Sequence, residues 1–258
     1  MRKTLLGLLI IMNLFTLKAN DKYAKEVFYS SVGDSIGYRI LIPQDYSADK
    51  KYPVILFLHG AGERGYDNDA QLMHGSDLFT KEENLNNYPA IVIFPQCKPN
   101  SNWATFSINN IKDNLFDGVY KWPSRDQELV MELFNYLVNN MSVDKSRLYI
   151  MGLSMGAFGT YEILARHPHI FAAAVPICGG GNLEVINRYA KQTALWITHG
   201  DNDQVVPVEY SQKIYNELKK HGSDVKYTEY KDVGHDSWTN TFNEPELLKW
   251  LFSKQRDR

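Results

Sequence analysis

The residues Tyr149-Ile-Met-Gly-Leu-Ser-Met-Gly-Ala157 are the most informative part of this chain, because they contain the pattern G-x-S-x-G. An apolar run ahead of Gly152 indicates a buried strand, and the residues after Gly156 are typical of a helix. Ser154 is therefore predicted to lie at the tip of a strained strand-to-helix turn, where small neighbours let the backbone crowd together. The N-terminus of the helix would then point at one exposed hydroxyl. The alternative is an ordinary glycine-rich turn.

Short apolar runs recur on both sides of this stretch and predict the strands of a sheet. Two segments, 23–29 and 36–42, are expected to pair antiparallel about a turn at Gly33 and Asp34. Residues 54–58 are wholly apolar, which is typical of a strand buried on both faces. The remaining predicted strands cover residues 90–94, 148–151, 172–176, 195–198 and 225–230.

Helical patterns fall between these strands. Ser124 and Gln127 are predicted to form a capping box ahead of an apolar face that repeats every four residues from Leu129 to Leu137. Further helices are expected over 157–166, between Pro207 and Gly222, and from Pro245 onward. Alternating strands and helices predict a mostly parallel sheet with helices on both faces, and ligands in such sheets bind beyond the carboxyl ends of the strands.

The glycine-rich loop HGAGERG, at positions 59–65, follows one of the predicted strands. Its glycines let backbone N–H groups face inward without shielding by side chains. We predict that the N–H of Ala61, or else that of Gly62, forms an oxyanion hole together with the N–H of Met155. A plain glycine-rich turn is the alternative. Two charged residues of this loop are expected to hold it as an ion pair rather than to act in catalysis: Glu63 and Arg64.

A general base and an acid that orients it are expected at later strand ends. Asp201 and Asp203 compete for the role of the acid, and Asp203 is favoured because the loop must reach outward before its acid turns back. Asp201 fits a turn-forming residue. His235 follows the acid on a loop, whereas His221 ends a predicted helix. The order Ser154, Asp203, His235 matches that of α/β-hydrolases and predicts a catalytic triad.

The connection over 96–123 is long and aromatic, and long loops near a site often bind substrate. Trp103 is the first candidate for substrate contact and Trp238 the second, while His59 and His199 could line the same pocket. The alternative is that the aromatic residues only pack the loop against the protein. The other aromatic residues of this connection are Phe106, Phe116, Tyr120 and Trp122.

The first 19 residues differ from the rest of the chain. Arg2 and Lys3 precede a mainly apolar run over 5–17, which is the pattern of a secretory signal peptide. We expect cleavage near Ala19, a secreted or periplasmic protein, and a single α/β-hydrolase domain over 20–258. An uncleaved membrane anchor is the alternative.

The composition, with 44% hydrophobic and 22% charged residues, is ordinary for a globular protein. Without residues 1–19, 25 basic and 30 acidic residues remain, a net charge of −5. A mildly acidic domain is a poor ligand for nucleic acid or for an anionic membrane. No metal-ligand spacing such as H-E-x-x-H occurs, so no metal is expected. The oligomeric state leaves no signal in the sequence.

Five motifs together resemble the secreted α/β-hydrolase esterases: HGAGERG at 59–65, PQC at 95–97, GLSMGAFG at 152–159, PICGGG at 176–181 and GHDSW at 234–238. The chain is similar over residues 35–252 to carbohydrate esterase family 1 (feruloyl and acetylxylan esterases), to polyhydroxybutyrate-depolymerase-like esterases and to "predicted peptidase" proteins. Ala157 departs from the pattern, since relatives often carry glycine there. The resemblance implies an eight-stranded sheet in the order 1-2-4-3-5-6-7-8 and no cofactor.

In that sheet order, Cys97 and Cys178 end strands that are separated by two others. At about 4.7 Å per strand, they lie too far apart for a disulfide. Two free, largely buried thiols are expected.

The function expected from these observations is hydrolysis of carboxylic esters through an acyl-enzyme on Ser154. Export and aromatic loop residues favour feruloyl or acetyl esters of plant polysaccharides. Two alternatives stay open: a serine peptidase of the prolyl-oligopeptidase type, and a carbohydrate-binding protein that has a hydrolase scaffold without catalysis.

Overall fold

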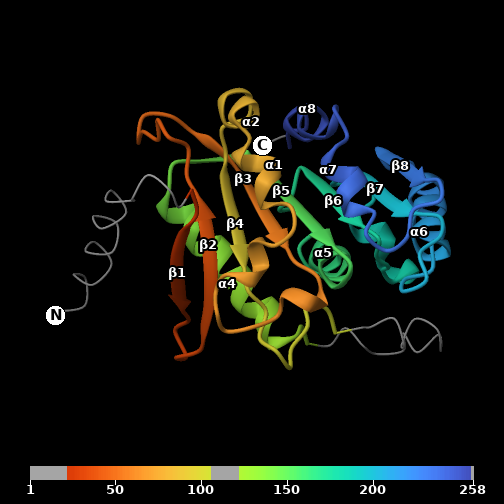
Figure 1. Ribbon diagram of the computed structural model, residues 1–258, viewed down its shortest axis with the longest axis horizontal. Coiled ribbons are helices and arrows are strands. Elements are labelled where there is room, and N and C mark those ends of the chain that lie inside the picture. Colours follow the sequence, from red (N-terminus) through yellow and green to blue (C-terminus); the bar gives the residue numbers. More distant parts are fainter. Residues whose placement is uncertain (1–21, 106–121, 257–258) are drawn as a thin grey trace.

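The computed structural model describes residues 22–105 and 122–256 and places eight strands in one sheet (Figure 1). The predicted signal peptide and the residues Phe106, Phe116 and Tyr120 lie outside the described residues. The strands are β1 (Ala24–Tyr29), β2 (Ser35–Leu41), β3 (Tyr52–Leu58), β4 (Ile91–Pro95), β5 (Val143–Leu153), β6 (Ala173–Ile177), β7 (Ala194–Gly200) and β8 (Val225–Tyr230).

The order of the strands is β1-β2-β4-β3-β5-β6-β7-β8. β2 runs antiparallel to both of its neighbours, and the pairs from β4 to β8 are parallel. The predicted α/β-hydrolase fold and its strand order are therefore confirmed. Most strand boundaries differ from the prediction by two residues or fewer, but β5 begins at Val143, five residues before the predicted start. Polar residues such as Asp144 and Arg147, which form an ion pair at 2.7 Å, hide this part of the strand from an apolar pattern.

Helices cover both faces of the sheet. Buried side chains of α4, α5 and α6 pack on one face, and those of α1 and α8 pack on the other. The described helices are α1 (Ser76–Thr80), α2 (Glu82–Asn87), α4 (Arg125–Asn140), α5 (Met155–Arg166), α6 (Glu209–Lys220), α7 (Trp238–Phe242) and α8 (Leu247–Phe252), with short 3₁₀ turns η2 (Ala61–Glu63), η3 (Ala70–Leu72) and η4 (Leu183–Arg188). Within the described ranges, no helix is long and apolar enough to cross a membrane.

The start of α4 confirms only half of the predicted capping box. The Ser124 Oγ accepts a hydrogen bond from the Gln127 N–H at 3.1 Å, as an N-cap residue does. The side chain of Gln127 does not reach back to Ser124. It instead donates to the backbone carbonyl of Trp103 at 2.6 Å and so ties the helix to the loop after β4.

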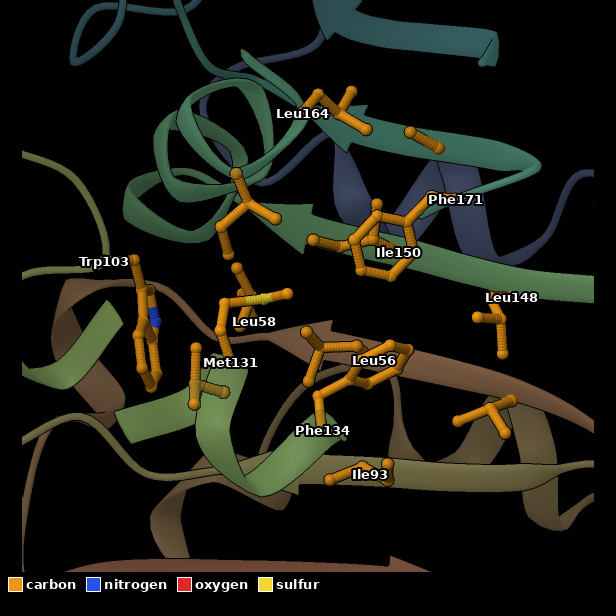
Figure 2. Packing of buried hydrophobic residues seen from close by; sticks show 14 of the residues in the cluster. Leu56, Leu58, Ile93, Trp103, Met131, Phe134, Leu148, Ile150, Leu164 and Phe171 are labelled. Atoms are coloured by element: carbon orange, nitrogen blue, oxygen red, sulfur yellow. The ribbon is translucent and has the colours of Figure 1, made fainter. Parts of the chain in front are cut away.

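The core on the α4 side is built from the central strands (Figure 2). Ile93, Leu56 and Ile150 lie on the adjacent strands β4, β3 and β5, and Phe134 of α4 packs over them. All four side chains are at most 1% exposed. Because both faces of the sheet are covered in this way, the polar groups available for chemistry lie at the strand ends.

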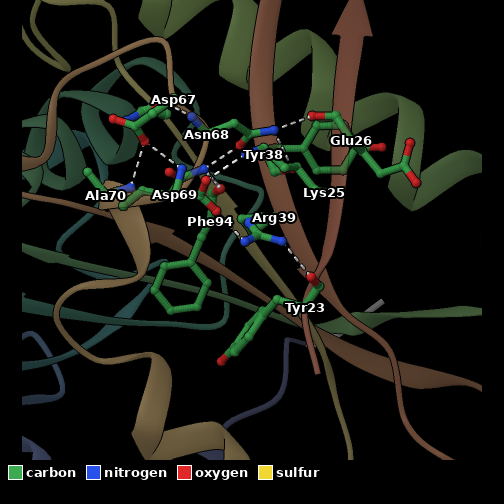
Figure 3. A network of polar contacts seen from close by, with 12 residues as sticks. Tyr23, Lys25, Glu26, Tyr38, Arg39, Asp67, Asn68, Asp69, Ala70 and Phe94 are labelled. Carbon is green, nitrogen blue, oxygen red and sulfur yellow. Dashed lines mark hydrogen bonds and ion pairs between the residues drawn. The ribbon is translucent and has the colours of Figure 1, made fainter. Parts of the chain in front are cut away.

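A polar network ties the segment between η2 and η3 to the edge of the sheet (Figure 3). Arg39 is buried, donates to the carbonyl of Tyr23 at 2.8 Å and forms an ion pair with Asp69. Asn68 donates to the carbonyl of Glu26 at 2.8 Å and has a positive φ of 54°, which asparagine tolerates better than most residues. The segment that follows the loop at 59–65 is therefore held in place by β1 and β2.

Candidate active site

Ser154 lies between the end of β5 and the start of α5, in a backbone conformation that few residues adopt. Its φ is 52° and its ψ is −117°. Such a conformation is costly and is kept only where the surroundings impose it. A Cβ on Gly152 would lie 2.3 Å from the Gly156 carbonyl oxygen, so the turn closes only with glycine there. The predicted strained turn is therefore present at Ser154.

The N-terminus of α5 packs directly on the end of β3. A Cβ on Gly156 would lie 2.0 Å from the carbonyl oxygen of Leu58 and 2.8 Å from that of His59. Glycine at this position thus brings the first turn of α5 against the loop at 59–65. This contact places the predicted oxyanion donors, on two separate segments, at the same end of the sheet.

Ser154, Asp203 and His235 come together from three loops. The Ser154 hydroxyl lies 2.9 Å from His235 Nε2, and His235 Nδ1 lies 2.7 Å from Asp203 Oδ2. Since the carboxylate only accepts, Nδ1 carries a proton, and Nε2 is left to accept one from the serine. Asp203 is almost fully buried, while the His235 side chain is 20% exposed. This arrangement can activate a serine hydroxyl as a nucleophile.

Several donors hold the carboxylate of Asp203. Burial alone would raise the pKa of Asp203, but hydrogen bonds from His199, His235 and the N–H groups of Val206 and Val205 outweigh it and lower that pKa well below its usual range. The carboxylate therefore stays ionised beside His235 and can stabilise a positive charge on the imidazole.

Asp201 has a structural role, as expected for a turn-forming residue. Its carboxylate accepts from the Asp232 N–H at 2.7 Å, which links the loop after β7 to the loop that carries His235. Gly200 permits the same approach, because a Cβ there would lie 2.2 Å from the Val233 carbonyl oxygen.

His199, predicted to line the pocket, is instead fully buried behind Asp203. Its Nε2 faces both Asp203 Oδ2, at 3.1 Å, and the Val206 carbonyl, at 2.9 Å, so this nitrogen carries a proton. Its Nδ1 lies 2.7 Å from the hydroxyl of Ser211. A second hydrogen-bond partner for the acid was not predicted. The sequence signal for this role was the position of His199, an ionisable residue at the end of an apolar strand and four positions before the acid.

His59 is also not a substrate-contacting residue, contrary to the prediction. It is 1% exposed, and burial lowers its pKa to about 4. Its Nε2 accepts from the Cys97 N–H at 2.9 Å, so Nδ1 carries the proton and donates to the Gly60 carbonyl at 2.6 Å. In a trans peptide the next N–H, that of Ala61, points the opposite way. His59 thus sets the orientation of the peptide that carries one predicted oxyanion donor.

Both predicted donors belong to segments that adjoin Ser154. The Met155 N–H is the first of α5, and N–H groups at a helix start have no acceptor within the helix. Ala61 begins η2, and a Cβ on the preceding Gly60 would lie 3.7 Å from Ser154 Cβ. The positions of Ala61 and Met155 therefore suit an oxyanion hole.

Trp103 is the third prediction that needs correction. The side chain is fully buried in the core beside Leu58 and Met131 (Figure 2), and its indole N–H donates to the His59 carbonyl at 3.0 Å. It packs the loop onto the protein, which was the alternative interpretation. Trp238 is half-buried at the start of α7, and its ring lies 5.4 Å from that of His235, so it stays a candidate for substrate contact.

The predicted ion pair between Glu63 and Arg64 does not form. Arg64 donates to the backbone carbonyls of Ala61 and Ser101, at 3.0 and 3.1 Å. The carboxylate of Glu63 is buried and faces His74 instead, with 3.8 Å between Oε1 and His74 Nε2. Adjacent residues on a 3₁₀ turn point in different directions, which explains the error.

Cys97 and Cys178 are free and buried, as predicted. Cys178 lies beneath the site, within 4.8 Å of ligand atoms of both Asp203 and His235. In the part of the chain that the structure describes, these three residues form the one grouping close enough to hold a metal ion. Asp203 and His235 already form a hydrogen bond with each other. Burial raises the pKa of the Cys178 thiol and so disfavours the thiolate that a metal ion would require.

Residues 45–246 match the model of the protein family described as Phospholipase/Carboxylesterase. Among curated proteins, a poly(3-hydroxyalkanoate) depolymerase C of Paucimonas lemoignei is 43% identical over 51 residues, 20% of this chain and 12% of that protein. A bifunctional acetylxylan esterase/xylanase of Neocallimastix patriciarum is 26% identical over 92 residues, 34% of this chain and 14% of that protein. The chain therefore spans only a small part of the curated relatives that it matches.

Solved structures give a similar result. A thermostable esterase superposes with a TM-score of 0.83 at 35% identity, over 91% of this chain and 64% of that one. A ferulic acid esterase superposes with a TM-score of 0.67 over 90% of this chain and 96% of that one, and its 18% identity shows the fold alone. The resemblance to esterases that the motifs predicted is confirmed.

Proposed function

Since this chain belongs to the phospholipase/carboxylesterase family, we propose that it hydrolyses carboxylic esters with Ser154 as nucleophile, His235 as general base and Asp203 as the acid that orients it. The observation that carries the proposal is the pair of hydrogen bonds from Ser154 to His235, 2.9 Å, and from His235 to Asp203, 2.7 Å. The match to the thermostable esterase supports the same class of reaction.

The reaction has two halves. Ser154 Oγ bonds to the ester carbonyl carbon while its proton moves to His235 Nε2, and the carbonyl oxygen becomes an oxyanion that accepts from the Ala61 and Met155 N–H groups. Collapse of this intermediate breaks the bond to the alcohol, which leaves with the proton from His235. Water then attacks the acyl-enzyme with the same base and releases the acid and the free serine.

The substrate that we propose is an ester attached to a plant polysaccharide, with a feruloyl or acetyl acyl group. The similarity to an acetylxylan esterase/xylanase supports this class. We also propose that the protein is secreted or periplasmic, because residues 1–19 have the pattern of a signal peptide. The net charge of −5 without that segment argues against nucleic acid as a partner.

Labelling with a fluorophosphonate probe tests the nucleophile. The folded protein should be labelled, and Ser154→Ala should abolish labelling and lower kcat by about 10⁶-fold. Ser253→Ala, on an exposed serine of the C-terminal segment, is the matched control and should label like the wild type. An unlabelled wild-type protein would support a binding protein that has a hydrolase scaffold without catalysis.

A hydrolysis panel tests the substrate class. We expect methyl ferulate or acetylated xylan to be cleaved with a higher kcat/KM than a peptide anilide, because the amine is a poorer leaving group than an alcohol. p-Nitrophenyl esters of rising chain length report the preferred size of the acyl group. Preference for the anilide would contradict the esterase proposal and favour a peptidase.

A further inference from the structure

Two aromatic side chains near the base have no part in the mechanism above: Trp238 contacts His235, and His74 contacts Trp238. Trp238 lies edge-on to the His235 ring, with 5.4 Å between centroids and an interplanar angle of 83°. The ring of His74 lies 5.1 Å from that of Trp238. We call His74 and Trp238 the aromatic wall. Trp238 is half-buried and the His74 side chain is 32% exposed, so the wall is partly open to solvent.

A buried carboxylate stands behind the wall. The Glu63 side chain is 8% exposed, and its Oε2 has no hydrogen-bond partner among the described residues. His59 Nδ1 lies 4.0 Å from that oxygen, but the N–H group at Nδ1 donates its hydrogen bond to the Gly60 carbonyl. Burying a carboxylate without a partner is costly. The other carboxylate oxygen, Oε1, faces His74, with 3.8 Å between it and His74 Nε2.

A series of contacts leads from the nucleophile to the wall. A Cβ on Gly60 would lie 3.0 Å from Glu63 Oε2 and 3.7 Å from Ser154 Cβ, so the carboxylate and the serine flank the same point. From Glu63 this series continues through His74 and Trp238 to His235. It therefore connects the loop that carries the Ala61 donor with the loop that carries the base.

This position decides which part of an ester the wall meets. The leaving oxygen must lie within hydrogen-bond distance of His235 Nε2 to receive its proton. The alcohol part of the ester therefore leaves the reaction centre beside the ring of His235. Trp238 contacts that ring, and His74 follows next to Trp238.

We propose that His74 and Trp238 form the subsite for the alcohol part of the ester, that Glu63 is the positioning residue of His74, and that this alcohol is a sugar. The inference rests on the proposed esterase function and deepens it. Aromatic rings offer flat apolar faces to the C–H groups of a sugar ring. The imidazole offers a hydrogen bond to a hydroxyl, and few convergent polar groups on an apolar surface are typical of small-molecule sites.

The wall is also built rigidly, as a specificity site requires. His74 follows η3, whose residue Gln71 is fully buried and forms a hydrogen bond with Asn68. Asn68 belongs to the network that joins this segment to β1 and β2 (Figure 3). Gln96 adds a bond of 3.1 Å to the Glu63 carbonyl.

Three acetates test the proposal, because they share the acyl group and differ only in the alcohol: acetylated xylobiose, ethyl acetate and octyl acetate. Acetate release gives kcat/KM for each. We expect His74→Ala to lower the ratio of the xylobiose ester to the ethyl ester about tenfold, mainly through KM, which corresponds to one lost hydrogen bond. His74→Phe keeps a ring without the polar group and should lower the same ratio.

Glu63→Gln should act in the same direction, and the double variant E63Q/H74A should lose no more than H74A alone, because both changes remove one interaction. His169→Ala, an exposed histidine after α5, is the control and should leave the ratio unchanged. An unchanged ratio in H74A, or a fall of the octyl-to-ethyl ratio instead, would overturn the sugar subsite. A wild-type enzyme that hydrolyses none of the acetates would contradict the proposed function itself.

Discussion

Single residues at the site are held by partners that lie one layer deeper. Asp203 accepts from His235 and from His199, and these bonds, with two backbone N–H groups, keep its pKa low despite burial. His199 is itself held by the Ser211 hydroxyl at 2.7 Å. Because these bonds hold the Asp203 carboxylate in one orientation, its hydrogen bond to His235 also fixes the orientation of the imidazole ring that faces Ser154.

His199→Asn should therefore lower kcat for an ester by about 10²-fold, with a smaller change in KM, because a misplaced acid lets the base turn away from Ser154. Steady-state kinetics on a p-nitrophenyl ester measure this effect. His221→Asn, at the C-cap of α6 with a side chain that is 39% exposed, is the matched control. A kcat in H199N equal to that of the control would show that His199 does not position the acid.

At the scale of elements, glycines bring the helix and the strands together closely enough for the site to form. The first turn of α5 touches β3 at Gly156, and the loop after β7 touches the loop of His235 at Gly200. In both places the obstacle that a side chain would meet is backbone, which cannot move aside as a flexible side chain can.

Gly156→Ala should destabilise the protein by about 3 kcal/mol or more, since overpacking against backbone adds to the usual cost of a larger side chain in a packed site. Urea unfolding followed by tryptophan fluorescence measures the change. Gly62→Ala is the control, because a Cβ there meets nothing within 4 Å. Equal stability of the two variants would contradict the close contact between α5 and β3.

At the scale of the whole molecule, a neutral histidine is built into the end of the sheet. Burial lowers the pKa of His59 to about 4, whereas an unfolded chain has a histidine pKa near ~6.5. The unfolded state therefore binds the extra proton first as the pH falls. The stability that His59 contributes is complete above pH ~6.5 and is lost as the pH falls toward 4.

The difference in unfolding free energy between the wild type and His59→Gln should accordingly shrink between pH ~6.5 and 4, by at most about 1.4 kcal/mol per pH unit. Urea unfolding at several pH values measures it. Ser253→Ala, which changes an exposed side chain that does not ionise, should show a constant difference from the wild type over the same range. A constant difference for H59Q would contradict a neutral His59.

Much of this architecture could be predicted from local pattern. Wholly apolar runs predicted β3 and β4, because a strand covered on both faces admits no polar residue. The pattern failed at the start of β5, where the strand carries polar residues such as Asp144. The placement of Ser154, Asp203 and His235 at three strand ends followed from chain order and from the geometry of parallel sheets.

The amino-acid sequence alone predicts the order of the elements, the strained turn at Ser154 and the three strand ends that carry the polar side chains, because these depend on neighbours along the chain. Which aromatic and histidine side chains face the site depends instead on contacts that form on folding. Trp103 and His59 are buried, whereas His74 packs against Trp238 beside the base, although loop residues of these types look alike in sequence. The G-x-S-x-G stretch predicts which atom attacks, whereas the surroundings that select the ester are assembled from segments far apart in the chain, whose contacts no local pattern records.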